Sequence, residues 1–205
     1  MYKKFIFDNY ITLNIFIIFF CICLLFVNSG YYVDNDIWFI LSIGREIVSN
    51  CSLFYQDVLS MHSMDIIIHQ WLFDVISWEI YSNCGGSALF LLSIAYYILT
   101  VYFFYRLCYL ISDNKNVSIL LSLFIFFLNI SNMNIRPMIV SNMLLVFEVY
   151  VLESFFKTGN EKLLMLLPFT ALLLANLHGA VVLLFFCIFM AYAAEVIIDL
   201  KKETA

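Results

Sequence analysis

Long apolar runs, each able to fill the hydrocarbon core of a membrane, restrict the fold of this chain most strongly. They fall at about 10–29, 86–111, 117–135, 138–156, 163–178 and 180–199. A transmembrane helix needs about 20 mostly apolar residues. Soluble domains contain about 25% charged residues, whereas 64% of this chain is hydrophobic and 12% is charged. We therefore expect an all-α integral membrane protein with about six transmembrane helices, which form a single membrane domain over residues 1–205.

The segment between the first two runs is far more polar than the rest. Residues 30–86 contain seven of the fifteen acidic residues. A shorter apolar stretch at 71–83 would extend only about 20 Å as a helix, against a core of about 30 Å. We therefore predict that 71–83 lies on the membrane surface, where its tryptophan and tyrosine side chains suit the headgroup region. A polar stripe predicts a second interfacial helix at 37–49.

The distribution of basic residues supports this topology. If 71–83 does not cross, eight basic residues share the side of the N-terminus and two, Arg45 and Arg136, lie opposite; if it crosses, the counts are three and seven. Basic residues concentrate on the cytoplasmic side of membrane proteins. The first arrangement therefore predicts cytoplasmic N- and C-termini and an outer loop at 30–86. The eight residues are Lys3, Lys4, Arg106, Lys115, Lys157, Lys162, Lys201 and Lys202.

The same topology gathers ionisable residues, including all three histidines, on the outer face. Asp34 and Asp36 follow the first apolar run closely, so either could act as a general base or could simply solvate the loop. Arg136, before Pro137, could bind a phosphate or extend to lipid headgroups. His178 could serve the same site or cap its helix, and Gly179 predicts a sharp backbone turn after it.

Other residue types limit the remaining functions. The basic residues are scattered in ones and twos, which argues against nucleic acid as a partner. Of six cysteines, only Cys51 and Cys84 fall in the outer loop, so at most one disulfide could form there. Glu148 falls inside an apolar run, where an unpaired charge is costly, and it should therefore face the helix bundle.

Seven short motifs occur in order along most of the chain. Together they resemble the GT-C superfamily of membrane glycosyltransferases, and more closely its bacterial multi-span members that carry Asp-x-Asp-x-Trp after the first span. The motifs here are Asp34-Asn35-Asp36-Ile37-Trp38, Gly44-Arg45-Glu46-Ile47, Asp57-Val58-Leu59-Ser60, His69-Gln70-Trp71-Leu72-Phe73-Asp74, Gly85-Gly86, Arg136-Pro137 and Asn176-Leu177-His178-Gly179.

This resemblance implies a glycosyltransferase of the hexosyl type in a bacterial plasma membrane, with a polyprenyl-phosphate-linked sugar as donor and membrane lipid around it. An acidic residue of the first outer loop is the base or a metal contact in this superfamily, and by position that role falls on Asp34 or Asp36. A divalent cation, if one is used, would be held by the same two residues. The expected substrate-binding residues are Arg45, His69, Trp71, Asp74, Arg136 and His178.

The resemblance leaves two alternatives open. Members of the superfamily continue with further spans, so this chain corresponds to an N-terminal portion. It could be a non-catalytic subunit or remnant that a second membrane chain completes. A transporter is the weaker alternative. The ionisable residues of a transporter should lie near the middle of the membrane, whereas those of this chain gather on one face.

Overall fold

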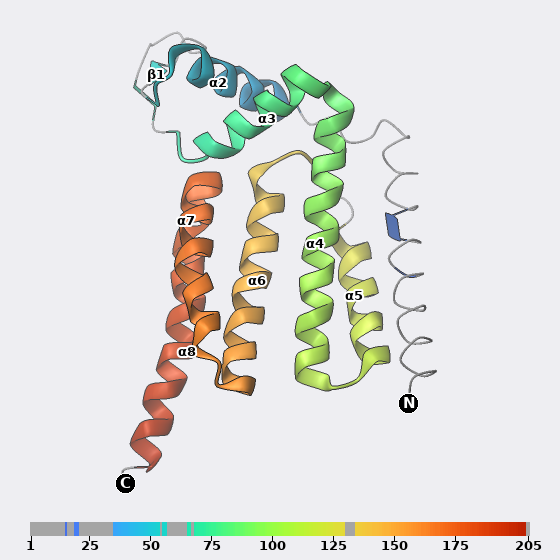
Figure 1. Cartoon of the computed structure of the whole chain (residues 1–205), viewed down its shortest axis with the longest axis vertical. Coiled ribbons are helices and arrows are strands. Elements are labelled where there is room, and N and C mark those ends of the chain that lie inside the picture. The colour runs from blue at the N-terminus through green and yellow to red at the C-terminus, as the bar shows by residue number, and fades with distance from the viewer. Residues whose placement is uncertain are drawn as a thin grey trace.

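A bundle of antiparallel helices with two further helices across one end makes up the computed structural model (Figure 1). The structure describes residues 15, 19, 20, 35–53, 55–56, 65–66, 68–129 and 134–203, with side chains up to residue 198. Apart from a two-residue antiparallel pairing of β1 (Tyr55–Gln56) with β2 (Asp65–Ile66), these residues form helices and the turns between them. The predicted all-α class is therefore confirmed for the described part of the chain.

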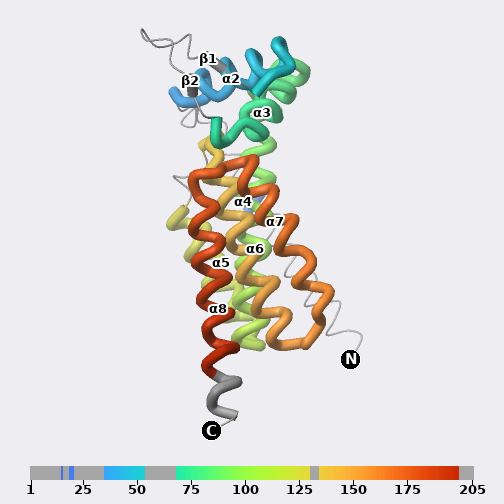
Figure 2. Tube along the Cα trace, turned by 90° about the vertical axis from the view of Figure 1, so that its left-hand side faces the viewer, coloured from blue at the N-terminus to red at the C-terminus, as the bar shows by residue number. Residues whose placement is uncertain are grey.

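The bundle helices alternate in direction along the chain. In both views α4 lies beside α5 and α6, and α7 lies beside α6 (Figures 1 and 2). Two short 3-10 helices, η2 and η3, precede α7 and α8. The bounds are α4 (Gly86–Ser112), α5 (Lys115–Asn129), α6 (Pro137–Thr158), η2 (Glu161–Met165), α7 (Leu166–His178), η3 (Gly179–Val181) and α8 (Val182–Glu203).

Helices α2 (Asp36–Asn50) and α3 (Trp71–Cys84) lie across one end of the bundle. They match the helices predicted at 37–49 and 71–83. The two helices pack closely at Gly44, where an added Cβ would lie 2.1 Å from the backbone oxygen of Asp74. A side chain at position 44 would therefore force α2 and α3 apart. We call this end of the molecule the α2–α3 end.

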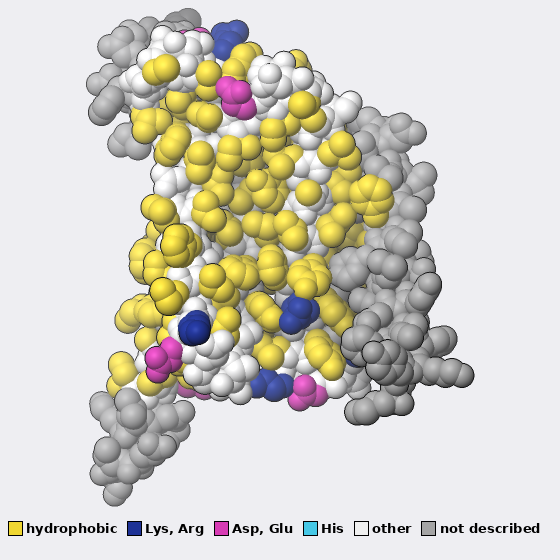
Figure 3. Space-filling view, viewed as in Figure 1, with side chains coloured by type: hydrophobic (Ala, Val, Ile, Leu, Met, Phe, Trp, Pro, Cys, Tyr) yellow, Lys and Arg dark blue, Asp and Glu magenta, His cyan; other side chains and the backbone are white. Residues whose placement is uncertain are grey.

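Hydrophobic side chains form a belt across the middle of the visible face, and charged side chains gather toward its two ends (Figure 3). Three stretches are long and apolar enough to cross a membrane, namely Gly86–Ser112, Pro137–Thr158 and Glu161–Ile198. The chain folds back within the third, because His178 leaves the helical conformation with φ −160° and ψ 71°. Helix α5 is apolar but has only 15 residues.

The predicted spans compare well with these helices. Those at 86–111 and 138–156 are confirmed as long apolar helices, and those at 163–178 and 180–199 correspond to α7 and α8. The span predicted at 117–135 begins as α5, and residues 130–133 lie outside the described part. Most of the span predicted at 10–29 also lies outside it, although Phe19 packs on Phe126 of α5 with ring centroids 4.3 Å apart.

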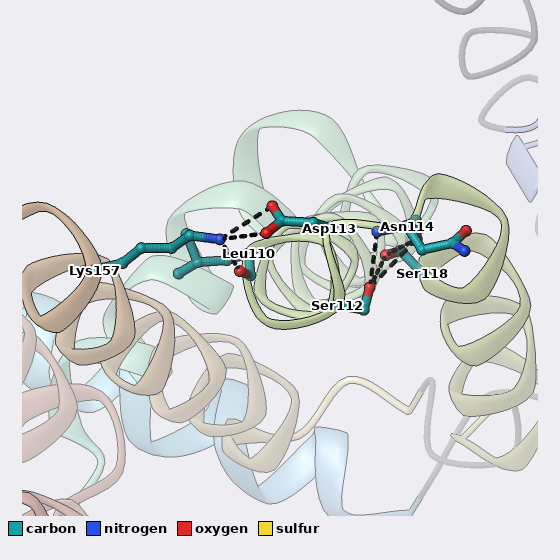
Figure 4. Close-up of polar contacts among 6 residues, drawn as sticks. All are labelled: Leu110, Ser112, Asp113, Asn114, Ser118 and Lys157. Atoms are coloured by element: carbon teal, nitrogen blue, oxygen red, sulfur yellow. Dashed lines mark hydrogen bonds and ion pairs between the residues drawn. The ribbon is translucent and has the colours of Figure 1, made fainter.

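The opposite end of the bundle, which we call the turn end, carries the α4–α5 and α6–η2 turns. Helix α4 ends at Ser112 and is followed by Asp113, whose φ of 49° is left-handed. The side-chain oxygen of Asn114 accepts hydrogen bonds from the backbone N–H groups of Asn116 and Val117 and so caps the start of α5. Lys157, in the last turn of α6, reaches across to Asp113 and to the carbonyl of Leu110 (Figure 4).

Two predictions about single residues are settled by the structure. Glu148 is fully buried in the bundle, as its place within an apolar run indicated. Cys51 and Cys84 are free thiols, so the disulfide that their positions allowed is not formed.

Candidate functional site

An exposed ion pair joins two of the predicted site residues. Nη2 of Arg136 lies 2.8 Å from Oδ2 of Asp36, and the side chains are 46% and 61% exposed. Asp36 is the first residue of α2, and Arg136 is the residue before Pro137, which begins α6. A proline suits this first helical position because its missing N–H would have no partner there. The fold thus brings together two motifs that are far apart in the sequence.

A second cluster joins the start of α3 to the end of α7. The indole N–H of Trp71 donates to the side-chain oxygen of Asn176 at 2.9 Å, and the backbone N–H of Gly179 donates to the backbone oxygen of His69 at 2.6 Å. The imidazoles of His69 and His178 are close enough to interact electrostatically. Five residues of the predicted motifs are therefore held against one another at the α2–α3 end.

The sharp turn predicted after His178 is present, but Gly179 is needed there for a different reason than expected. Its φ of −55° is ordinary for a helix, so the turn after His178 does not need the conformational freedom of glycine. The constraint is instead close approach, because an added Cβ would lie 3.0 Å from the backbone oxygen of His69. Glycine is needed here so that the end of α7 can approach the residue before α3.

Ser141 belongs to this cluster and was missed by the sequence analysis. Its hydroxyl oxygen lies 2.6 Å from Nδ1 of His178, and the side chain is fully buried. Serine inside an apolar helix carries no signal of its own. The one hint in the sequence is that Ser141 follows the Arg136-Pro137 motif by about one helical turn.

Asp74 lies apart from these contacts, inside the packing of α3. Its carboxyl is fully buried, and Nε2 of Gln70 donates to its Oδ1 at 3.0 Å. In the described part of the chain, its Oδ2 has no hydrogen-bond partner, and neither does the buried hydroxyl of Ser77 one turn later. Burial raises the pKa of Asp74 to about 7, although the hydrogen bond from Gln70 opposes this shift.

The predicted substrate-binding residue Arg45 also lies apart from the ion pair. It is exposed on α2, and its guanidinium is 3.4 Å from the carboxylate of its chain neighbour Glu46. Arg45 therefore contacts its own helix, whereas Arg136 contacts another element of the fold. Its assignment to substrate binding stays a prediction.

Two acidic positions of the motifs lie outside the described residues, namely Asp34 and Asp57. Within the described ranges, no group of three or more histidine, cysteine and acidic side chains could hold a metal ion. The carboxylate of Asp36 lies against the guanidinium of Arg136. A cation held by both Asp34 and Asp36 stays a prediction.

A cavity of about 260 Å³ opens between α4, α5 and α6. Its wall is mostly apolar and includes Tyr97, Val101, Ile125, Ile139, Asn142 and Val146. Ile139 follows Arg136 by only three residues, so the cavity begins close to the Asp36–Arg136 pair along α6. An apolar chain attached to a group at Arg136 could enter it.

Comparisons of the chain with protein-family models, with curated proteins and with solved structures found no match.

Proposed function

We propose that this chain is a GT-C-like glycosyltransferase, or the N-terminal portion of one, that moves a sugar from a polyprenyl-phosphate carrier to an acceptor on the outer membrane face. The observation that carries the proposal is the exposed contact between Asp36 and Arg136. Such a transfer requires a base for the acceptor and a positive group for the departing phosphate. Arg136 supplies the positive group, and the carboxylate comes from Asp36 or from Asp34, two residues earlier in the chain.

The proposed reaction forms one bond and breaks one. The acceptor hydroxyl attacks the anomeric carbon and gives its proton to a carboxylate, while the bond from that carbon to the phosphate oxygen breaks and its electron pair leaves with the lipid phosphate. Asp34 is the preferred base, because it comes first after the apolar run and so should lie nearer the donor. Asp36 orients Arg136, and Arg136 neutralises the departing phosphate.

In this proposal α4 to α8 and the run at 10–29 cross the membrane, which gives about six spans. Helices α2 and α3 then lie on the outer surface, and the turn end is cytoplasmic. The apolar belt of Figure 3 supports an embedded bundle. The preference of basic residues for the cytoplasm supports the orientation, because Lys115, Lys157 and Lys162 all belong to the turn end. The cavity beside Ile139 would admit part of the polyprenyl chain.

Two alternatives make different predictions. A non-catalytic subunit would keep the phosphate site but would transfer no sugar without a second membrane chain. A transporter is favoured only by Glu148, which is buried in the middle of α6 and whose carboxyl oxygens have no hydrogen-bond partner among the described residues. In that case Glu148→Gln should abolish transport and leave phosphate binding at Arg136 unchanged.

The test of the proposal is binding of a fluorescent polyprenyl-phosphate probe to the protein in lipid nanodiscs. Arg136→Ala should weaken binding by about tenfold or more, because the loss of a hydrogen bond to a charged group costs about 1.5–3 kcal/mol. Lys157→Ala is the matched control, since it also removes an exposed basic partner of an aspartate, Asp113, from the other end of α6. Equal losses in the two variants would show that general attraction to charge is being measured and would overturn the proposal.

A further inference from the structure

Ser141 and His178 make a close contact between α6 and the end of α7. The hydroxyl oxygen of Ser141 lies 2.6 Å from Nδ1 of His178, and the same oxygen lies 3.1 Å from the backbone oxygen of Pro137, one turn earlier in α6. Ser141 is fully buried, so water cannot replace either contact. These two distances restrict where the hydrogen atoms can be.

A hydroxyl group has one hydrogen to donate, and a carbonyl oxygen can only accept. Both contacts of Ser141 are hydrogen bonds at once only if its hydroxyl hydrogen points to the carbonyl of Pro137 and its oxygen accepts from His178. In that arrangement Nδ1 of His178 carries a hydrogen. In a neutral imidazole with a hydrogen on Nδ1, the other ring nitrogen, Nε2, is the proton acceptor.

Among the residues that the structure describes, the ring of His178 makes one hydrogen bond, through Nδ1 to Ser141, and none through Nε2. The ring itself is half-buried at the α2–α3 end, between the first turns of α6 and the residues before α3. The charged and titratable groups on these elements are Arg136 with its partner Asp36 on the α6 side, and His69 and Asp74 on the α3 side.

We propose that Ser141 is a positioning residue that holds His178 with its hydrogen on Nδ1, so that Nε2 is the atom that exchanges a proton with a phosphate-bearing substrate at the start of α6. The substrate in this inference rests on the proposed function, whereas the tautomer rests on the contacts of Ser141 alone. Protonated Nε2 donates its hydrogen to a phosphate oxygen of the leaving group. The ring returns to the neutral form and takes its next proton from water.

This arrangement suits both charge states of the ring. Nδ1–H stays on the oxygen of Ser141 whether or not Nε2 is protonated, so the imidazole does not have to rotate during proton exchange. A histidine fixed in one tautomer is typical of general acid–base sites, where a second group orients the ring. Ser141 is such a group, supplied by the same helix that begins with Arg136.

The test is nitrogen NMR of the full chain in nanodiscs, labelled with 15N-histidine, at a pH where the imidazoles are neutral. The chain has three histidines, so single His→Gln variants assign the signals. His178 should show a protonated Nδ1 and an unprotonated Nε2. Ser141→Ala should turn it into a mixture of tautomers, and Ser141→Thr, which keeps the hydroxyl, should restore the Nδ1–H form.

Ser122→Ala is the matched control. Ser122 is also buried in a helix and donates to the carbonyl four residues earlier, at 2.7 Å from Ser118, but it belongs to α5. This variant should leave the His178 signals unchanged. A protonated Nε2 in the neutral wild-type ring, or identical spectra for wild type and Ser141→Ala, would overturn the role of Ser141, and the wild-type spectrum decides even if Ser141→Ala does not fold.

The substrate half of the inference is tested separately. Addition of a short-chain prenyl phosphate should shift the Nε2 signal of His178. No shift would overturn the exchange of a proton with phosphate. Failure of the Arg136→Ala binding test together with the expected tautomer would reject the proposed function and leave the role of Ser141 standing.

Discussion

The two ends of α6 carry ion pairs that look alike but have different physical reasons to exist. At the turn end, Nζ of Lys157 lies 3.0 Å from Asp113, and it also donates to the carbonyl of Leu110 at 2.6 Å. A cation in the last turn of a helix is favoured by the helix dipole, and this one also satisfies a free carbonyl at the end of α4. Stability alone accounts for Lys157.

Arg136 has the opposite relation to the same helix. It occupies the N-cap of α6, where the dipole disfavours a cation and favours an anion. Its side chain caps no backbone group of α6, in contrast to serine, aspartate and related residues that stabilise helix starts. The dipole, the guanidinium and the exposed position together suit an anion, and Asp36 provides one in the structure.

Length and exposure do not distinguish these two ion pairs. The distances are 2.8 Å and 3.0 Å, and both pairs are exposed. What differs is the effect of the helix dipole, which favours the cation at Lys157 and disfavours the cation at Arg136. Lys157 is explained by its neighbours, whereas Arg136 stands where the dipole of α6 opposes it, and we propose that it binds a ligand that competes with Asp36.

The largest expected effect comes from reversal of the Arg136 pair. The double variant Asp36→Arg with Arg136→Asp restores an ion pair between α2 and α6, so the melting temperature should stay near that of the wild type. It removes the cation from the start of α6 and puts a carboxylate there, so binding of the polyprenyl-phosphate probe should fall by about a hundredfold, since the charged hydrogen bond is lost and the new carboxylate repels the phosphate.

This experiment separates structure from function at one site. Melting is followed by circular dichroism and binding by fluorescence on the same samples. Recovery of probe binding in the double variant would mean that only the ion pair matters, and the distinction between the two ends of α6 would be lost.

The next effect concerns the buried carboxyl of Asp74 at the α2–α3 end. Its pKa is raised from 3.8 to about 7 in the folded protein. Between these values the folded state binds more protons than the unfolded state, so the free energy of unfolding should fall as pH rises, by about 1.4 kcal/mol per pH unit, and should level off above pH 7. Asp74→Asn should remove this slope, because asparagine is neutral and still accepts from Gln70.

Tryptophan fluorescence reports on unfolding of the α2–α3 end alone, because all three tryptophans, Trp38, Trp71 and Trp78, lie on α2 and α3. Thermal melts at pH 5, 6 and 7 should therefore show the slope directly. Asp113→Asn, which neutralises an exposed carboxylate at the turn end, is the control and should keep the wild-type slope. If the stability of the wild type does not change between pH 5 and pH 7, then Asp74 is not buried in its protonated form.

The fold was largely predictable because it depends on local features. Apolar runs of sufficient length give α4 and α6 within about two residues of their observed bounds. The stretch at 71–83 was recognisable as a surface helix because it is too short to cross and carries aromatic and acidic residues together. Each of these signals is contained in one segment and does not require knowledge of its neighbours.

The site was less predictable because it depends on contacts between segments. The predicted topology placed Asp36 and Arg136 on one face but could not pair them, or show that Arg45 would contact Glu46 instead. Ser141 could not be found at all, since a buried serine in a helix usually bonds only to its own backbone. Its second contact exists only because the end of α7 lies beside it.

The smallest expected effect belongs to Lys157 and tests the structural half of the comparison. Lys157→Ala leaves the carbonyl of Leu110 without its donor and Asp113 without its partner, both at the end of α4. Exposed pairs contribute up to about 1 kcal/mol, so the melting temperature should fall by a few degrees. Hydrogen exchange should quicken in the last turn of α4, because that turn loses its cap, and should stay unchanged in the first turns of α6.

Probe binding should match that of the wild type. If Lys157→Ala instead weakens probe binding while α4 stays protected, then the cation at the turn end also serves a ligand, and the helix dipole no longer separates the two ends of α6.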